Sequence, residues 1–165
     1  MVAKRQPPTD VDRAEVVRIA LSGIAAGRDF DDIAADLTPF HPAHNTFPGE
    51  LLLELAADAL ELSGASRTEP LDYSGIRERY LPDFDIRGKY QHRKSHFVLR
   101  SAVFVRAGVD PAILDEVAYW NTDDFYVWAL FALFIFVRAA AERTESTPDA
   151  VCVAIAERRD IQLTS

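Results

Sequence analysis

Residues 123–143 read DDFYVWALFALFIFVRAAAER, and we expect the fold to be built around this segment. It holds the longest apolar run of the chain, thirteen residues from Phe125 to Val137, and Arg138 ends the run. A helix that crosses a membrane needs about 20 apolar residues, so this run is too short. A helix that is apolar on nearly all sides is typical of the buried centre of a soluble bundle. We therefore expect this segment to be the core and expect no contact with a membrane.

The segments on either side also have helical signatures. Capping residues such as Thr9 and Thr147 precede apolar periodic segments, and glycines such as Gly27 and Gly108 follow them. No segment alternates apolar and polar residues with the period of two that indicates a strand. The sequence thus predicts an all-α protein, a compact bundle of six to eight helices around the buried apolar helix at 123–143. The expected helices cover about 9–26, 31–37, 48–63, 73–80, 89–107, 110–120, 122–143 and 148–159.

Length and composition indicate one domain and a reducing compartment. A chain of 165 residues with 48% hydrophobic residues is long enough to bury a core. We expect residues 1–8 to be a flexible tail and residues 9–165 to form a single all-α domain. Cys152 is the only cysteine, so no internal disulfide can form. The N-terminus has no apolar core of signal-peptide type, and we expect a cytoplasmic protein.

Charge is strongly segregated along the chain. Residues 86–109 contain six Lys or Arg residues and no acidic residue, whereas residues 29–66 contain eight carboxylates and no Lys or Arg. The chain as a whole carries a net charge of −8 and a pI near 4.9. This acidity disfavours binding to duplex DNA, which requires a high local density of cations. The basic window is the exception, and such segregation can steer a charged partner.

Most of the basic window falls on one face of the helix predicted at 89–107. Four residues lie within about 60° of one another on a helical projection, and we call them the basic face: Lys89, Arg93, His96 and Arg100. We expect the basic face to bind an acidic protein or an anionic ligand. The alternative is a solvated face, or one that pairs internally with the acidic stripe of the helix at 48–63. That stripe consists of Glu50, Glu54, Asp58 and Glu61.

The entrance of the same helix suggests an enzymatic alternative. Residues 87–92 read RGKYQH, which places Arg87 and His92 in an Arg-x4-His pattern. This pattern resembles the catalytic motif of HEPN-type ribonucleases, although Gly88 stands where that family usually has a polar residue. The resemblance implies an all-α, dimeric ribonuclease in which Arg87 and His92 act on RNA.

Other functional patterns are weaker. His92 and His96 are four residues apart, a spacing used by helical zinc ligands, but the neighbouring cations disfavour a bound metal dication. The sequence has no nucleophile elbow, phosphate-binding loop or dinucleotide fingerprint. A further alternative is a small apolar-ligand binder around Trp120, Trp128 and Phe131. We expect a binding protein rather than an enzyme, without cofactor or metal. We also expect it to be a homo-oligomer, most simply a homodimer, because a helix apolar on all sides requires neighbours on all sides.

Overall fold

The computed structural model describes residues 8–40, 47–64, 72–80, 88–110 and 122–163. The regular structure of these residues is entirely helical, which confirms the predicted all-α class. The described helices are α1 (Asp10–Ala25), α2 (Phe30–Leu37), α4 (Phe47–Leu62), α5 (Tyr73–Tyr80), α6 (Gly88–Arg106), α8 (Thr122–Arg143) and α9 (Pro148–Arg158). The helix expected at 110–120 and the tail expected at 1–8 fall outside the described residues, apart from Asp110 and Pro8.

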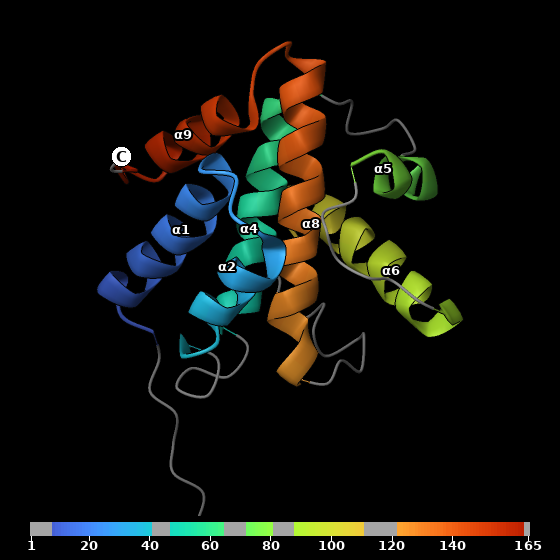
Figure 1. The fold of residues 1–165 in the computed structure, drawn as a ribbon, viewed down its shortest axis with the longest axis horizontal. Coiled ribbons are helices and arrows are strands. Elements are labelled where there is room, and N and C mark those ends of the chain that lie inside the picture. Colours follow the sequence, from blue (N-terminus) through green and yellow to red (C-terminus); the bar gives the residue numbers. More distant parts are fainter. Residues whose placement is uncertain (1–7, 41–46, 65–71, 81–87, 111–121, 164–165) are drawn as a thin grey trace, which may run out of the picture.

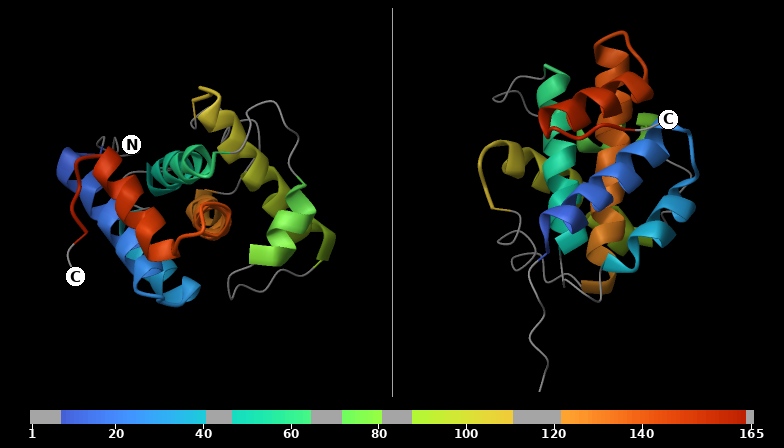
Figure 2. Two further views of the ribbon diagram at one scale, coloured as in Figure 1. Left: turned by 90° about the horizontal axis from the view of Figure 1, so that it is seen from above. Right: turned by 90° about the vertical axis from the view of Figure 1, so that its left-hand side faces the viewer.

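Helix α8 stands at the centre of the bundle, directly beside α4 (Figure 1). Seen from above in Figure 2, α1, α2 and α9 lie on one side of this central pair, and α5 and α6 lie on the other. The first and last helices of the chain, α1 and α9, pack against each other. Helices α5 and α6 also contact each other, and both contact α8. The basic window therefore belongs to a flank that the middle of the chain builds.

The apolar run of α8 is the core, as its sequence predicts. All residues from Trp128 to Val137 are at most 4% exposed. Phe30 of α2 meets Phe134 edge to face, with ring centroids 5.3 Å apart. Within the described residues, Phe125–Arg143 is the one segment long and apolar enough to span a membrane, and 78% of its most apolar window is buried inside the bundle. That burial is the state expected of a core helix in a soluble protein.

A glycine allows α4 to approach α8 closely. Gly49 lies in the first turn of α4 and is buried against the ring of Phe125. A Cβ atom at position 49 would lie 2.7 Å from Phe125 Cε1, which is closer than two carbon atoms pack. The absence of a side chain at Gly49 thus sets the spacing of the two central helices.

Capping residues mark the starts of α1 and α9, and a glycine follows the end of α6, as the sequence predicts. The Thr9 side chain accepts a hydrogen bond from the Asp12 N–H, and the Asp12 carboxylate accepts one from the Thr9 N–H, both at 3.1 Å. This reciprocal pair is a capping box that fixes the start of α1. Thr147 caps α9 by accepting from the Ala150 N–H at 3.1 Å. At the end of α6, Gly108 adopts a φ of 104°, a conformation that L-residues rarely adopt.

Candidate functional site

The acidic stripe of α4 meets arginines from other elements. Arg13 of α1 lies with Nη2 3.6 Å from Glu54 Oε2. Arg159, which follows α9, donates from Nε to Asp58 Oδ2 at 2.9 Å. The Arg159 and Asp58 side chains are only 27% and 20% exposed, so solvent screens this pair less than a surface pair. These two carboxylates therefore find their counter-ions on the flank that α1 and α9 build.

A third ion pair links the stripe to the basic window. Arg106, the last residue of α6, donates from Nε to Glu61 Oε2 at 2.8 Å. Arg106 lies in the basic window but outside the basic face, which consists of four other residues of the same helix. The basic window therefore contributes Arg106 to the acidic stripe, whereas no ion pair joins the described side chains of the basic face to that stripe.

Burial makes these counter-ions important for Glu54. Burial raises the pKa of the Glu54 carboxyl, and the positive charges of Arg159 and Arg13 oppose that rise. Desolvation disfavours a carboxylate unless a cation stands close to it. Arg13 and Arg159 therefore act as internal counter-ions of the acidic stripe.

The basic face itself points away from this network. Arg93 and Arg100 are both exposed, and neither forms an ion pair with another residue in the described part of the chain. The Arg100 guanidinium lies 5.7 Å from the centroid of the Phe104 ring, at cation–π distance. Phe104 is 39% exposed, so an arginine and an aromatic ring stand together at the surface. The side chain of Lys89 lies outside the described part of the structure.

Helix α5 packs against the middle of the basic face. The Tyr73 and His96 rings are tilted against each other, with centroids 4.8 Å apart. Arg77 donates from Nη1 to Ser95 Oγ at 3.1 Å. Burial raises the pKa of the Tyr73 hydroxyl, and the positive charge of Arg100 opposes that rise. His96 is consequently a partly buried packing residue between two exposed arginines, and α5 covers this middle part of the face.

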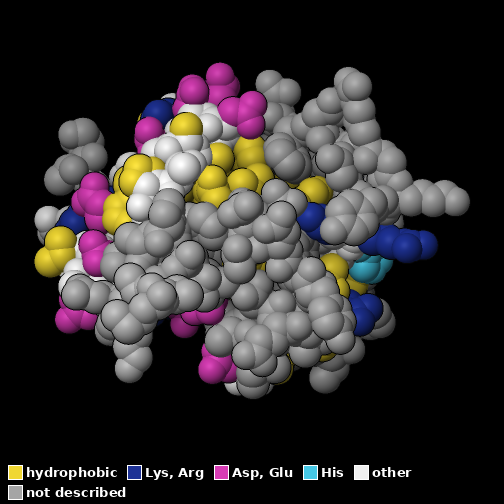
Figure 3. Space-filling model, turned by 90° about the horizontal axis from the view of Figure 1, so that it is seen from below, with side chains coloured by type: hydrophobic (Ala, Val, Ile, Leu, Met, Phe, Trp, Pro, Cys, Tyr) yellow, Lys and Arg dark blue, Asp and Glu magenta, His cyan; other side chains and the backbone are white. Residues whose placement is uncertain are grey.

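Figure 3 views this charge distribution from below. Among the side chains that are coloured, Lys, Arg and His gather on the side that α5 and α6 occupy, and most Asp and Glu side chains lie away from that side. The segregation along the sequence is therefore preserved in space. The contribution of α5, through Tyr73 and Arg77, was not predicted from the sequence. No sequence signal marks it, because the contact depends on how two separate helices pack.

Most residues of the ribonuclease and metal alternatives lie outside the part of the chain that the structure describes. Arg87 and the side chain of His92 are not among the described residues. Within the described part of the chain, no three His, Cys, Asp or Glu side chains cluster as metal ligands would. The side chain of His96 instead packs on Tyr73. The Arg87–His92 ribonuclease remains a prediction.

The aromatic residues considered for an apolar ligand are packed in the core. The Trp128 and Phe131 rings meet edge to face with centroids 5.5 Å apart, and they are 4% and 0% exposed. Trp120 lies outside the described residues. Neither Trp128 nor Phe131 is among the described residues that line the cavity between α4, α5 and α8 or the one between α1 and α9.

Comparison with known proteins identifies no relative. No protein-family model matches the chain, and neither a curated protein nor a solved structure matches it.

Proposed function

We propose that the protein is a non-enzymatic binding protein that uses the basic face of α6 to engage an acidic protein. One observation carries this proposal. Three carboxylates of the acidic stripe, Glu54, Asp58 and Glu61, pair with arginines outside the basic face. Arg93 and Arg100 stay exposed. Two exposed guanidinium groups on one helix face are available to an external carboxylate. Arginine is well suited to that contact, because its planar fork binds a carboxylate through two parallel hydrogen bonds.

The dimensions of the face fit a segment of protein. Arg93 and Arg100 are seven residues apart, which corresponds to about 10 Å along a helix axis. Phe104 continues the same surface by one further turn, beside Arg100. Arginine and aromatic side chains are enriched at protein–protein interfaces, where they form many of the energetically dominant contacts. An exposed ring beside an exposed guanidinium favours an acidic protein over a small inorganic anion.

The distribution of charge over the chain should direct an acidic partner toward the basic face. Outside the basic window the chain has a large excess of acidic residues, which disfavours the approach of an acidic partner from other directions. Complementary potentials raise the association rate and suppress wrong encounters more than they raise affinity. We expect the association to weaken with salt, because exposed charges are screened over about 10 Å at about 0.1 M ionic strength.

The test is a double charge reversal with a matched control. Arg93→Glu combined with Arg100→Glu should weaken binding of fluorescent poly-glutamate at least tenfold, measured by anisotropy at low salt. Arg18→Glu combined with Arg158→Glu makes the same change in net charge at exposed positions of α1 and α9. The control variant should retain most of the binding. Equal losses in the two variants would mean that only net charge matters, and unchanged binding in the first would mean that the basic face is merely solvated.

A homo-oligomer and a cytoplasmic location remain part of this proposal. Helix α8 finds its neighbours within the chain, so an interface between copies would have to use other apolar side chains. The large exposed hydrophobic residues of the described part are Val11, Phe104 and Val153. Sedimentation over a wide concentration range tests self-association, and a monomer throughout would exclude it.

The cytoplasmic location is supported by the buried free thiol of Cys152 and by the burial of α8.

A further inference from the structure

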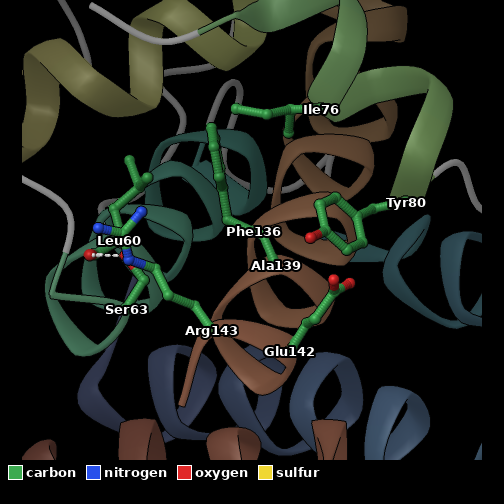
Figure 4. Close-up of a pocket in the computed structure, with 8 residues that line it drawn as sticks. All are labelled: Leu60, Ser63, Ile76, Tyr80, Phe136, Ala139, Glu142 and Arg143. Carbon is green, nitrogen blue, oxygen red and sulfur yellow. Dashed lines mark hydrogen bonds between the residues drawn. The ribbon is translucent and has the colours of Figure 1, made fainter. Parts of the chain in front are cut away.

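A cavity of about 310 Å³ lies between α4, α5 and α8. Its apolar wall is formed by Leu60 of α4, Ile76 of α5, and Phe136 and Ala139 of α8. Figure 4 shows Phe136 and Ala139 in the middle of the cavity wall, with Leu60 on one side and Tyr80 on the other. A concave, mainly apolar space with a few polar groups at its edge is the usual form of a small-molecule site.

The charged residues at the edge of the cavity differ in their partners. Glu142 accepts a hydrogen bond from Arg79 Nε at 3.2 Å, and the Arg79 Nη2 atom forms an ion pair with the same carboxylate. The charge of Glu142 is therefore balanced by α5. Arg143 also lines the cavity, and within the described residues it joins no ion pair. The edge of the cavity thus presents one uncompensated positive charge next to an apolar wall.

We propose that this cavity binds a small carboxylic acid whose apolar body packs between Ile76 and Ala139 and whose carboxylate pairs with Arg143. The volume sets the size of the ligand. A cavity of about 150 Å³ accommodates benzene, so about twice that volume suits a body of roughly ten non-hydrogen atoms. A medium-chain fatty acid such as octanoate has this size and carries one carboxylate. The cavity shares none of its described lining residues with the basic face, so a defect in one site leaves the other testable.

Charge and shape favour a carboxylate over other amphipathic molecules. The guanidinium group offers paired N–H donors in a plane, which match the two oxygens of a carboxylate. An ammonium group at the same place would meet Arg143 as a like charge. An alcohol of the same chain length would gain the apolar contacts but not the ion pair. The order of affinity should therefore be octanoate, then octanol, then octylamine.

Calorimetric titration of the full chain with these three probes tests the proposal. Octanoate should bind one site with a dissociation constant at or below about 1 mM. Arg143→Gln should weaken octanoate binding about tenfold and should leave octanol binding nearly unchanged. Arg158→Gln is the matched control, because Arg158 is exposed and also stands in the last turn of its helix. That variant should bind octanoate as the unaltered protein does.

A second variant fills the space instead of removing the charge. Ala139→Leu adds three carbon atoms to the cavity wall and should abolish binding of octanoate and octanol alike. Ala35→Leu makes the same change at an exposed position of α2 and should have no effect. Methyl NMR of the unaltered protein provides a test without substitutions. Octanoate should shift the Ile76 methyl signals at the cavity and not those of Ile33, which is buried under α1.

Three outcomes would overturn the proposal. They are the absence of saturable octanoate binding, equal binding of all three probes, and octanoate-induced shifts at Ile33 without shifts at Ile76. The ordered affinities together with loss in Ala139→Leu and weakening in Arg143→Gln would support it.

Discussion

Arg106 and Glu61 tie the end of α6 to the end of α4 through a hydrogen-bonded ion pair, with Nε 2.8 Å from Oε2. The Arg106 side chain is only 11% exposed, whereas that of Glu61 is 38% exposed. The guanidinium group has therefore lost most of its hydration and depends on the protein for hydrogen bonds. This ion pair connects the basic window to the central helix α4. If Glu61 were removed, water could not easily replace it as the hydrogen-bond acceptor of Arg106.

We predict that Arg106→Gln lowers the free energy of unfolding by about 1–3 kcal/mol, because it removes a charge-assisted bond from a nearly buried site. Arg93→Gln changes an exposed arginine of the same helix and should stay within about 0.5 kcal/mol of the unaltered protein. Urea denaturation measures both. A double-mutant cycle with Glu61→Gln should give a coupling of about 1 kcal/mol, and a coupling near zero would show that the pair adds nothing.

The burial of Phe131 makes it the clearest test of the core. Phe131 is 0% exposed in the centre of α8, so Phe131→Ala should lower the free energy of unfolding by about 3–5 kcal/mol. Phe104→Ala removes the same ring from a position that is 39% exposed and should cost less than about 1.5 kcal/mol. Denaturant melts of both variants make the comparison. Similar losses at the two positions would mean that α8 is not the centre of the fold.

At Gly49, helix propensity and packing make opposite predictions. Alanine is a better helix former than glycine, by up to about 1 kcal/mol in a helix interior, so propensity alone predicts that Gly49→Ala in the first turn of α4 stabilises the protein slightly. The new Cβ would, however, lie 2.7 Å from Phe125 Cε1, within a tightly packed contact. We predict a net loss of about 1–3 kcal/mol, because overpacking forces α4 and α8 apart.

Phe125→Leu supplies the control for the Gly49 variant. It removes ring atoms from the contact, so the Gly49→Ala and Phe125→Leu double variant should be more stable than the sum of the single losses predicts. Strict additivity in thermal or urea unfolding would contradict a clash between these two positions.

The thiol of Cys152 should make stability depend on pH in the alkaline range. Burial, with a smaller contribution from the negative charge of Asp149, raises the pKa of Cys152 from 9.0 to about 12. Below pH 9 the thiol is protonated in both the folded and the unfolded state. Between pH 9 and about 12 the unfolded chain ionises and the folded protein does not, so the unfolded state binds fewer protons and stability falls as pH rises.

The slope of this loss should approach about 1.4 kcal/mol per pH unit. Cys152→Ala should lower the free energy of unfolding at every pH because it leaves a small void. The decrease of that free energy with pH should be less steep in this variant, because the thiol no longer contributes. Urea unfolding from pH 8 upward gives both slopes. Parallel slopes would show that the folded thiol ionises normally. The buried thiol should also resist a thiol-specific reagent at pH 8 until the protein unfolds.

The candidate sites show where sequence reasoning stops. Arg93 and Arg100 were predicted to share a helix face, and both are exposed on α6. Periodicity is a property of one helix, so a helical projection gives this result without any tertiary information. The pairing of Arg106 with Glu61, and the packing of Tyr73 on His96, join different helices. The cavity beside Arg143 likewise takes its walls from three helices, and no local pattern marks it.

Three features could be predicted from sequence alone: the all-α class, the central position of residues 125–137, and the helix boundaries at Thr9, Thr147 and Gly108. Each of these features follows from local chemistry: an uninterrupted apolar run must be buried, and caps satisfy the N–H groups that a helix start leaves open. Which arginines pair with the acidic stripe, and which remain exposed, could not be predicted from the sequence and became clear from the packed helices. That choice depends on the angles and spacing at which helices pack, and these are set by contacts such as Gly49 on Phe125 between residues far apart in the chain.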